Sequence, residues 1–227
     1  NTTPGDPPKA RTVPPKETAM KLIYTASQVR EAEKPYIEAA DYDGYLMQRA
    51  ADAVAAEAQE LLHGKDKAKI LLLIGPGNNG ADTIYAGARL SAKGHSVDAV
   101  IFDSSEKNLE LIAREGGEGT RVLDPEHALE QLAGYDLTID GILGTGSSGA
   151  VRGSAGEYLG VLRAAQLDGK LGAVLAVDTP SGVDNNRGTV HEPSLRADRT
   201  VTFIGHKLPA GTSHSVHSGD IKLYDLG

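Results

Sequence analysis

The feature that most constrains the fold is a short apolar run that leads directly into a glycine-rich loop. Residues 70–74 read ILLLI, and residues 75–82 read GPGNNGAD. A continuous apolar run of this length is typical of a strand in a parallel sheet, because helices cover both faces of such a sheet. Helical spacing over 82–92 and a second strand over 96–102 complete a βαβ unit. We therefore expect a parallel sheet with helices packed on it.

The same alternation continues on both sides of this unit. The stretch over 1–20 is rich in proline and lacks apolar periodicity, so we expect a flexible leader there and one folded domain over 21–227. Strands and helices alternate without an internal repeat, which favours a Rossmann-like three-layer αβα fold with a mostly parallel central sheet. Further helices are expected over 25–40, 45–62, 108–114, 126–132 and 154–165, and further strands over 137–139, 173–177, 199–203 and 221–224.

Composition narrows the classes of function. The chain of 227 residues carries 23 Lys and Arg against 31 Asp and Glu, so nucleic acid is not an expected partner. No apolar run approaches the roughly 20 residues that cross a bilayer, and we expect no membrane-spanning segment. The absence of Cys rules out thiolate catalysis, disulfides and Cys-ligated zinc. A cytoplasmic location is the default expectation.

The glycine loop allows two interpretations. GPGNNG satisfies the pattern G-x-G-x-x-G between a strand and a helix, and Asp103 follows about 20 residues later, which favours an NAD-dependent oxidoreductase. Asn78, Asn79 and Asp82 argue against a plain phosphate loop, because a carboxylate in the first helical turn would compete with phosphate for the positive end of the helix. A tight turn and helix cap without a ligand is the structural alternative.

Three further predicted strands end in polar loops. They are residues 140–149 (DGILGTGSSG), 178–184 (DTPSGVD) and 205–211 (GHKLPAG). The carboxyl ends of parallel strands meet at one edge of a sheet, where open α/β sheets bind ligands, so we expect these loops to meet the glycine loop. The chain lacks the G-x-S-x-G pattern of a serine hydrolase and the G-x-x-x-x-G-K-[ST] pattern of a P-loop nucleotidase.

With these motifs in order, the sequence over 22–226 resembles the YjeF N-terminal domain family. The family's loop G-x-G-N-N-G-G-D corresponds to GPGNNGAD, with Ala81 in place of the last glycine. Its D-x-x-x-G-T-G and D-x-P-S-G-[LV]-D motifs correspond to DGILGTG and DTPSGVD, and its late strand followed by lysine corresponds to TVTFIGHK, which ends at Lys207. The chain departs from the family where Gln48-Arg49 replaces Glu-Asn and KLPAG replaces K-P-G.

The resemblance implies an activity and a site. The best described activity of the family is that of NAD(P)HX epimerase, which interconverts the R and S forms of hydrated NADH or NADPH at C6 of the nicotinamide ring without redox change. The resemblance implies NADHX or NADPHX as the substrate. It also implies a potassium ion (K+) held by Asn79, Asp140 and Ser181, whose hard oxygen ligands suit such a cation. The substrate-binding residues that it implies are Asn78, Asn79, Gly80, Ala81, Asp82, Gly144, Thr145, Gly146, Ser147, Ser148, Gly149, Ala150 and Asp178.

Charged residues at strand ends provide the catalytic hypothesis. Inverting C6 requires proton transfer at its hydroxyl, or opening and closure of the ring, and both routes need an acid/base group. We expect Asp178 to be the principal acid/base residue, with Asp140 assisting it or binding the ion. Lys207 is expected to supply positive charge near the site.

Two other functions stay open. One is a non-catalytic nucleotide-binding or scaffold domain of the same fold, although the presence of Asp140, Asp178, Asn79 and Ser181 favours the enzyme. The other is a nicotinamide-dependent dehydrogenase, which leaves DTPSGVD unexplained. The resemblance also implies a homodimer, and a fused or separate ATP- or ADP-dependent dehydratase that acts on the S form.

Overall fold

The computed structural model describes residues 23–38, 44–102, 106–207 and 216–226, and the predicted leader over 1–20 lies outside them. The helices are α1 (Ala26–Ile37), α2 (Tyr45–Leu61), α3 (Asn78–Ala92), α4 (Glu106–Glu115), α5 (Pro125–Glu130), α6 (Gly153–Leu167) and the 3-10 helix η1 (Leu132–Gly134). The strands are β1 (Ile23–Tyr24), β2 (Lys69–Ile74), β3 (Ser96–Ile101), β4 (Thr120–Val122), β5 (Leu137–Gly141), β6 (Ala173–Val177), β7 (Val183–Asp184), β8 (Thr189–Val190), β9 (Arg199–Phe203), β10 (His206–Lys207) and β11 (Asp220–Tyr224). None of these helices has the length and apolar character that a bilayer crossing requires.

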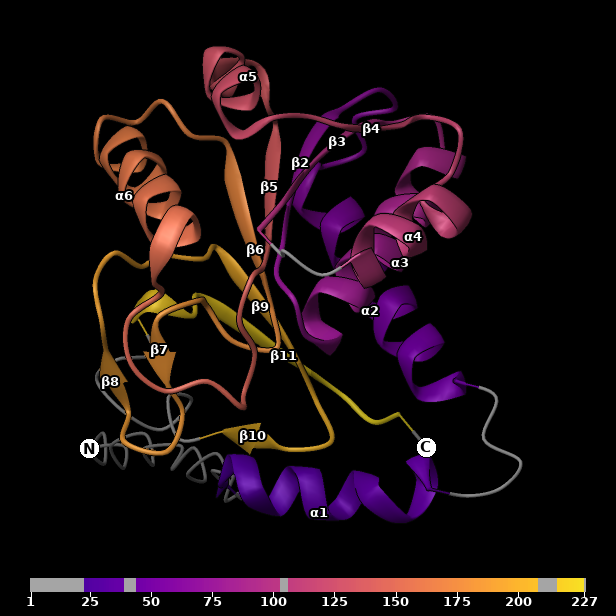
Figure 1. Cartoon of the computed structure of the whole chain (residues 1–227), viewed down its shortest axis with the longest axis vertical. Coiled ribbons are helices and arrows are strands. Elements are labelled where there is room, and N and C mark those ends of the chain that lie inside the picture. The colour runs from indigo at the N-terminus through magenta and orange to yellow at the C-terminus, as the bar shows by residue number, and fades with distance from the viewer. Residues whose placement is uncertain (1–22, 39–43, 103–105, 208–215, 227) are drawn as a thin grey trace, which may run out of the picture.

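A parallel sheet forms the centre of the molecule. Within the described residues it has 7 strands in the order β11-β9-β6-β5-β2-β3-β4, and its neighbouring strands pair in parallel (Figure 1). From β2 the chain first adds β3 and β4 on one side, and then adds β5, β6, β9 and β11 on the other. The strand order therefore reverses between β2 and β5, as in Rossmann-like folds. The predicted fold class is confirmed.

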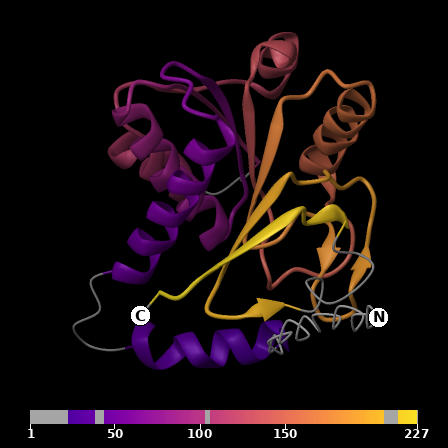
Figure 2. The ribbon, with the colours of Figure 1, turned by 180° about the vertical axis from the view of Figure 1, so that it is seen from behind.

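Helices cover both faces of this sheet. Figures 1 and 2 show from opposite directions that α2, α3 and α4 lie on one side and α6 on the other. The apolar run of β2 contributes to both layers: Ile70, Leu72 and Ile74 pack in the core with α2 and α3, whereas Leu71 and Leu73 pack in the core with α6. All of these side chains are 0% exposed. Burial on both faces is the reason why the run is continuous and does not alternate with polar residues.

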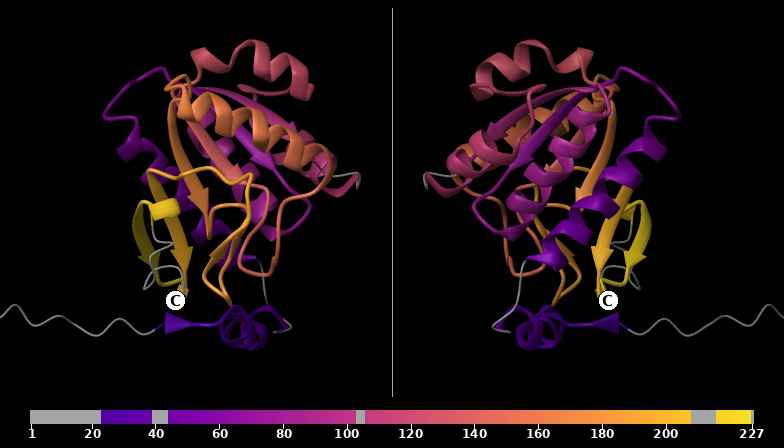
Figure 3. Two further views of the ribbon diagram at one scale, coloured as in Figure 1. Left: turned by 90° about the vertical axis from the view of Figure 1, so that its left-hand side faces the viewer. Right: turned by 90° about the vertical axis from the view of Figure 1, so that its right-hand side faces the viewer.

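Helix α1 lies across the carboxyl ends of the strands, where Figure 3 shows it nearly end-on. Thr25 begins the helix in a capping box with Gln28, in which each side chain accepts a hydrogen bond from the backbone N–H of the other residue. The parallel pairing of β1 with β10 places Tyr24 opposite Lys207. Val29 of α1 packs into the protein, and only 6% of the Val29 surface is exposed.

Several element boundaries differ from the prediction. The helix after the glycine loop begins at Asn78 and not at Asp82, so both loop asparagines belong to its first turn and Asp82 does not. The expected competition of the Asp82 carboxylate with phosphate at the first turn is therefore wrong. The next helix begins at Glu106 rather than at Asn108. The short strands β1, β4, β7, β8 and β10 were not predicted, because two or three residues carry no measurable period.

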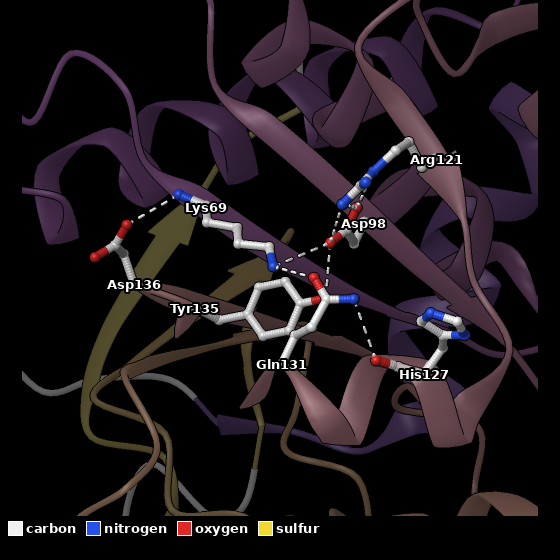
Figure 4. Close-up of polar contacts among 7 residues, drawn as sticks. All are labelled: Lys69, Asp98, Arg121, His127, Gln131, Tyr135 and Asp136. Atoms are coloured by element: carbon white, nitrogen blue, oxygen red, sulfur yellow. Dashed lines mark hydrogen bonds and ion pairs between the residues drawn. The ribbon is translucent and has the colours of Figure 1, made fainter. Parts of the chain in front are cut away.

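A buried carboxylate links the strands at the β4 side of the sheet to the segment before β5 (Figure 4). Asp98 of β3 is 0% exposed, and Arg121 of β4 donates to both of its oxygens, at 2.8 Å and 2.9 Å. The Tyr135 hydroxyl donates to Asp98 Oδ2 at 2.7 Å. Lys69 Nζ lies 3.7 Å from the same oxygen and donates to Gln131 Oε1 at 2.6 Å. Removal of Asp98 would therefore take away the carboxylate that Arg121, Lys69 and the Tyr135 hydroxyl share.

Replacing Asp98 by Ala is expected to lower the free energy of unfolding by about 3 kcal/mol, because Arg121, Lys69 and the Tyr135 hydroxyl lose their shared acceptor. Urea unfolding followed by circular dichroism measures the loss. Lys65→Ala is the control, since it breaks a pair with Asp136 at 2.7 Å whose side chains are 53% and 29% exposed. That change is expected to cost less than about 1 kcal/mol. Equal losses for the two variants would contradict a special role for the buried carboxylate.

Candidate functional site

A pocket of about 510 Å³ lies at the carboxyl edge of the sheet, between the loops that follow β2 and β5. The strand order reverses at this place, and connections that diverge from such a point leave a crevice in which open α/β sheets bind ligands. The lining residues are Val29, Pro76, Gly77, Asn78, Asn79, Asp82, Ile142, Leu143, Gly144, Thr145, Gly146, Ser147, Asp178 and Phe203.

The glycine loop brings the start of α3 to this pocket. Gly77 is the N-cap of α3 and provides no side-chain cap, so an anionic ligand group can approach the backbone N–H groups of the first turn. The flanking glycines are required by packing. A Cβ on Gly75 would lie 1.8 Å from the carbonyl oxygen of Ile142, and a Cβ on Gly80 would lie 2.0 Å from the carbonyl oxygen of Gly75. Glycine therefore allows the two loops and the helix to meet backbone against backbone.

Asn79 links three of the predicted site segments. Its Nδ2 donates to the carbonyl oxygen of Val177 at 2.7 Å, at the end of β6, and to that of Leu143 at 3.1 Å, after β5. Both bonds use the amide donors and leave Oδ1 as the acceptor end of the side chain. This oxygen lies next to Gly144, where an added Cβ would be 2.9 Å from it. The orientation of the Asn79 amide is thus fixed by the backbone of the two neighbouring loops.

Asp178 follows β6 and lies in the pocket. Its backbone has a φ of 67°, in the left-handed region that is uncommon for residues other than glycine. The Asp178 N–H donates to the carbonyl oxygen of Val201 at 2.6 Å. Its Oδ2 accepts from the Thr145 N–H at 2.7 Å, and its Oδ1 accepts from the Thr202 hydroxyl at 3.2 Å. Donors from two different strand ends therefore orient the two carboxylate oxygens.

Asp140, near the end of β5, is 0% exposed and is not part of the pocket lining. Its Oδ1 accepts from the Ser181 hydroxyl at 2.6 Å and from the Ile142 N–H at 3.3 Å, and its Oδ2 accepts from the Ser181 N–H at 2.8 Å. Burial raises the pKa of the Asp140 carboxyl, and these hydrogen bonds act against that rise. No charged group among the described residues contributes to the shift.

The structure brings most of the predicted site together. The predicted substrate-binding residues that line the pocket are Asn78, Asn79, Asp82, Gly144, Thr145, Gly146, Ser147 and Asp178. Gly80 and Ala81 are buried in α3 behind this surface, and Ser148, Gly149 and Ala150 are not part of the lining. The predicted ion ligands meet through the backbone of Leu143, whose carbonyl accepts from Asn79 and whose N–H donates to the Ser181 hydroxyl at 3.0 Å.

The structure does not place three charged residues named from the sequence in the pocket: one is buried away from it, and two lie wholly or partly outside the described residues. Asp140 does not reach the pocket surface, so this structure gives it no direct contact with a ligand there. The backbone of Lys207 lies in β10, but its side chain lies outside the described part of the structure. Asp103, on which the dehydrogenase alternative depended, also lies outside the described residues.

Sequence reasoning missed residues that reach the site from other elements. Val29 and Phe203 add apolar surface to the lining, and no sequence signal separates them from ordinary core residues. Thr202 contacts Asp178 only because β9 lies beside β6. Asn108 of α4 is 0% exposed and donates to the carbonyl oxygen of Gly75 at 2.7 Å. A polar residue on the buried face of a helix is the signal that could have identified Asn108.

The fold and the pocket define a Rossmann-like α/β protein with a ligand site at the strand ends. A family model described as YjeF-related protein N-terminus matches residues 44–208, and the chain belongs to this family. The matched range contains the glycine loop, both aspartate-led loops and Lys207. The family prediction is confirmed.

Known relatives and a solved structure agree with this assignment. The chain is 31% identical over 216 residues to the bifunctional NAD(P)H-hydrate repair enzyme Nnr of Mycobacterium tuberculosis, and the match covers 92% of this chain and 42% of that protein. It is 35% identical over 214 residues to the NAD(P)H-hydrate epimerase of Microbacterium testaceum, covering 92% and 80%. The chain thus spans less than half the length of the bifunctional relative. The crystal structure of yeast YNL200c shares the fold, with a TM-score of 0.73, 20% identity, and coverage of 90% and 88%.

The contact between Gly75 and Ile142 leads to a test of the site's architecture. Gly75→Ala is expected to lower the free energy of unfolding by about 3 kcal/mol or more, because its Cβ would lie 1.8 Å from a backbone oxygen that cannot rotate away. Thermal and urea unfolding measure the effect. Gly160→Ala in α6 is the control, since nothing lies within 4 Å of the added Cβ, and it is expected to be neutral or slightly stabilising. A Gly75→Ala protein as stable as the control would show that the loops can separate freely.

Proposed function

We propose that this chain carries NAD(P)H-hydrate epimerase activity, which interconverts the R and S forms of hydrated NADH and NADPH at C6 of the nicotinamide ring. The observation that carries the proposal is the oriented carboxylate of Asp178 in a pocket beside an uncapped helix start. The M. testaceum relative, which the chain matches over 80% of its length, bears the name of this activity.

The pocket offers distinct surfaces to the two kinds of group in such a substrate. The first turn of α3 begins at Asn78 behind the N-cap Gly77, and backbone N–H groups at a helix start favour phosphate oxygens. The side chains of Val29, Leu143 and Phe203 provide apolar lining suited to a ring. This division supports a dinucleotide ligand despite the net charge of −8, because backbone groups supply the phosphate contacts.

Epimerisation at C6 requires one bond to that carbon to break and re-form on the other face. If the hydroxyl leaves, it must first accept a proton; if the ring opens, the hydroxyl must lose its proton while the bond from C6 to the ring nitrogen breaks. We assign this proton transfer to Asp178 in the pocket: as a carboxylic acid it would protonate a departing hydroxyl, and as a carboxylate it would take the hydroxyl proton while N1 receives the electron pair of the breaking C6–N1 bond. Closure of the ring or return of water reverses the same transfer. The Thr145 N–H and the Thr202 hydroxyl hold that carboxylate in one orientation, so proton transfer does not require a prior rotation of the side chain.

Asp178→Asn is expected to lower kcat/KM for epimerisation by about 100-fold or more, because an amide cannot exchange the proton. The rate of conversion of R-NADHX to S-NADHX above the spontaneous rate, followed by NMR or chromatography, measures this. Asp168→Asn is the control, since Asp168 ends α6 with its side chain 62% exposed and is not part of the pocket lining. Near-normal activity of Asp178→Asn would remove Asp178 from the mechanism, and no acceleration by the wild type would favour a non-catalytic binding domain.

We further propose that Asn79, Asp140 and Ser181 hold a potassium ion. Their amide, carboxylate and hydroxyl oxygens are hard donors, and the buried Asp140 has no charged partner among the described residues. The ion would supply the positive charge that keeps Asp140 ionised. Because burial raises the pKa of Asp140, protons compete with the cation, and its binding weakens as pH falls. Lys207 stays a proposed source of positive charge near the substrate.

Potassium is expected to stabilise the wild-type protein by mass action, by about 1.4 kcal/mol at ten times its Kd. Melting temperatures in KCl and in choline chloride at equal ionic strength measure this, and epimerase rates in the same buffers test whether activity depends on the ion. Asp140→Asn is expected to lose the difference between the two salts, because an uncharged amide attracts a cation less strongly. An equal difference in wild type and variant would show that K+ binds elsewhere.

The names of the relatives suggest a wider setting for this activity. The M. tuberculosis protein is named as a bifunctional repair enzyme and is more than twice as long as its match to this chain. We propose that the S form made here is consumed by an ATP- or ADP-dependent dehydratase, in the same polypeptide or in a separate one. A homodimer and a cytoplasmic location are further proposals that accompany this function.

A further inference from the structure

The end of β9 holds both the backbone and the side chain of Asp178. The Asp178 N–H donates to the carbonyl oxygen of Val201 at 2.6 Å, and the next residue, Thr202, donates its hydroxyl to Asp178 Oδ1 at 3.2 Å. A φ of 67° is unfavourable for a residue with a Cβ, and contacts of this kind help to maintain it. Two successive residues of β9 therefore fix the position and the direction of the Asp178 side chain.

Strand pairing alone does not explain why the buried residue 202 carries a hydroxyl group. The register of β6 against β9 ends at Val177 and Val201, so Asp178 and Thr202 directly follow the last paired residues of two neighbouring strands. The Thr202 residue is only 3% exposed. Valine has nearly the same shape and would avoid the cost of burying a hydroxyl, which is recovered only where that hydroxyl finds a polar partner. Among the described residues, the Asp178 carboxylate at the pocket is such a partner.

We propose that Thr202 is a positioning residue for the reaction, because its hydroxyl holds the Asp178 carboxylate in the orientation from which proton transfer occurs. The inference rests on the proposed epimerase function. Thr202 is not part of the pocket lining and acts through Asp178, whereas its neighbour Phe203 reaches the pocket directly. Loss of the hydroxyl removes this donor from Oδ1, while the Thr145 N–H still holds Oδ2, so the carboxylate is less restrained against rotation.

Three variants test this with matched shapes. Thr202→Val removes the hydroxyl, Thr202→Ser keeps it, and Thr200→Val removes another buried hydroxyl from the same strand. Thr200 is 2% exposed and donates to the carbonyl oxygen of Ser218 at 2.7 Å. Thr202→Val is expected to lower kcat by about tenfold, the effect of losing one hydrogen bond to a charged group, with KM changed less than about twofold. Thr202→Ser is expected to recover most of that loss, and Thr200→Val to leave both constants unchanged.

Crystal structures of the wild type and of Thr202→Val provide a readout that does not depend on turnover. In Thr202→Val the Asp178 carboxylate is expected to rotate or to occupy more than one conformer, and in Thr202→Ser it is expected to keep the wild-type orientation. An unchanged carboxylate in Thr202→Val would overturn the inference, as would a rise in KM alone or an equal loss of kcat in Thr200→Val. If the wild type does not accelerate epimerisation, the proposed function fails, and the crystal structures still decide whether Thr202 holds Asp178.

Discussion

The parallel pairing of β2 with β5 is the constraint on which the site depends. It runs from Ile70 opposite Leu137 to Ile74 opposite Gly141, and the Gly75 N–H continues it to the Gly141 carbonyl at 3.2 Å. Because the two strands end together, the glycine loop and the loop after β5 leave the sheet side by side. Their separation is so small that only glycine fits at position 75. The pocket is therefore a consequence of strand order and register, and the loops add the chemical groups.

Two buried carboxylates in this molecule are balanced in different ways. Asp98 is held by Arg121, with Lys69 nearby, so its charge is compensated within the protein. Asp140 receives hydrogen bonds from Ser181 and Ile142 but no cation among the described residues, and burial raises its pKa. Only a site that exchanges a proton or an ion benefits from leaving a buried charge uncompensated. The Asp98 carboxylate is therefore compensated by cations of the protein, whereas the Asp140 carboxyl is stabilised by hydrogen bonds.

The glycine pattern resembles a dinucleotide fingerprint, but its glycines say little about which ligand binds. Gly75 and Gly80 are required by backbone contacts that exist whatever ligand binds. The asparagine between them carries the specific information, since the Asn79 amide connects the ends of β5 and β6 through Leu143 and Val177. Close approach of backbone to a pyrophosphate, the role of the glycines in a dinucleotide fingerprint, does not by itself call for this connection. Family membership and the hydrogen bonds of Asn79 thus agree.

The sequence by itself determined the longer strands of the central sheet, their parallel arrangement, the polar loops at their ends and the family, because these depend on local periodicity and on motifs read in order. Tertiary structure decided which of the two loop aspartates faces the pocket: Asp178 does so in a left-handed conformation, whereas Asp140 is buried beneath it. It also decided that α3 begins at Asn78 and that Thr202 reaches Asp178. A side chain's direction and partners at a strand end depend on neighbouring strands that are distant in sequence, and no local pattern encodes them.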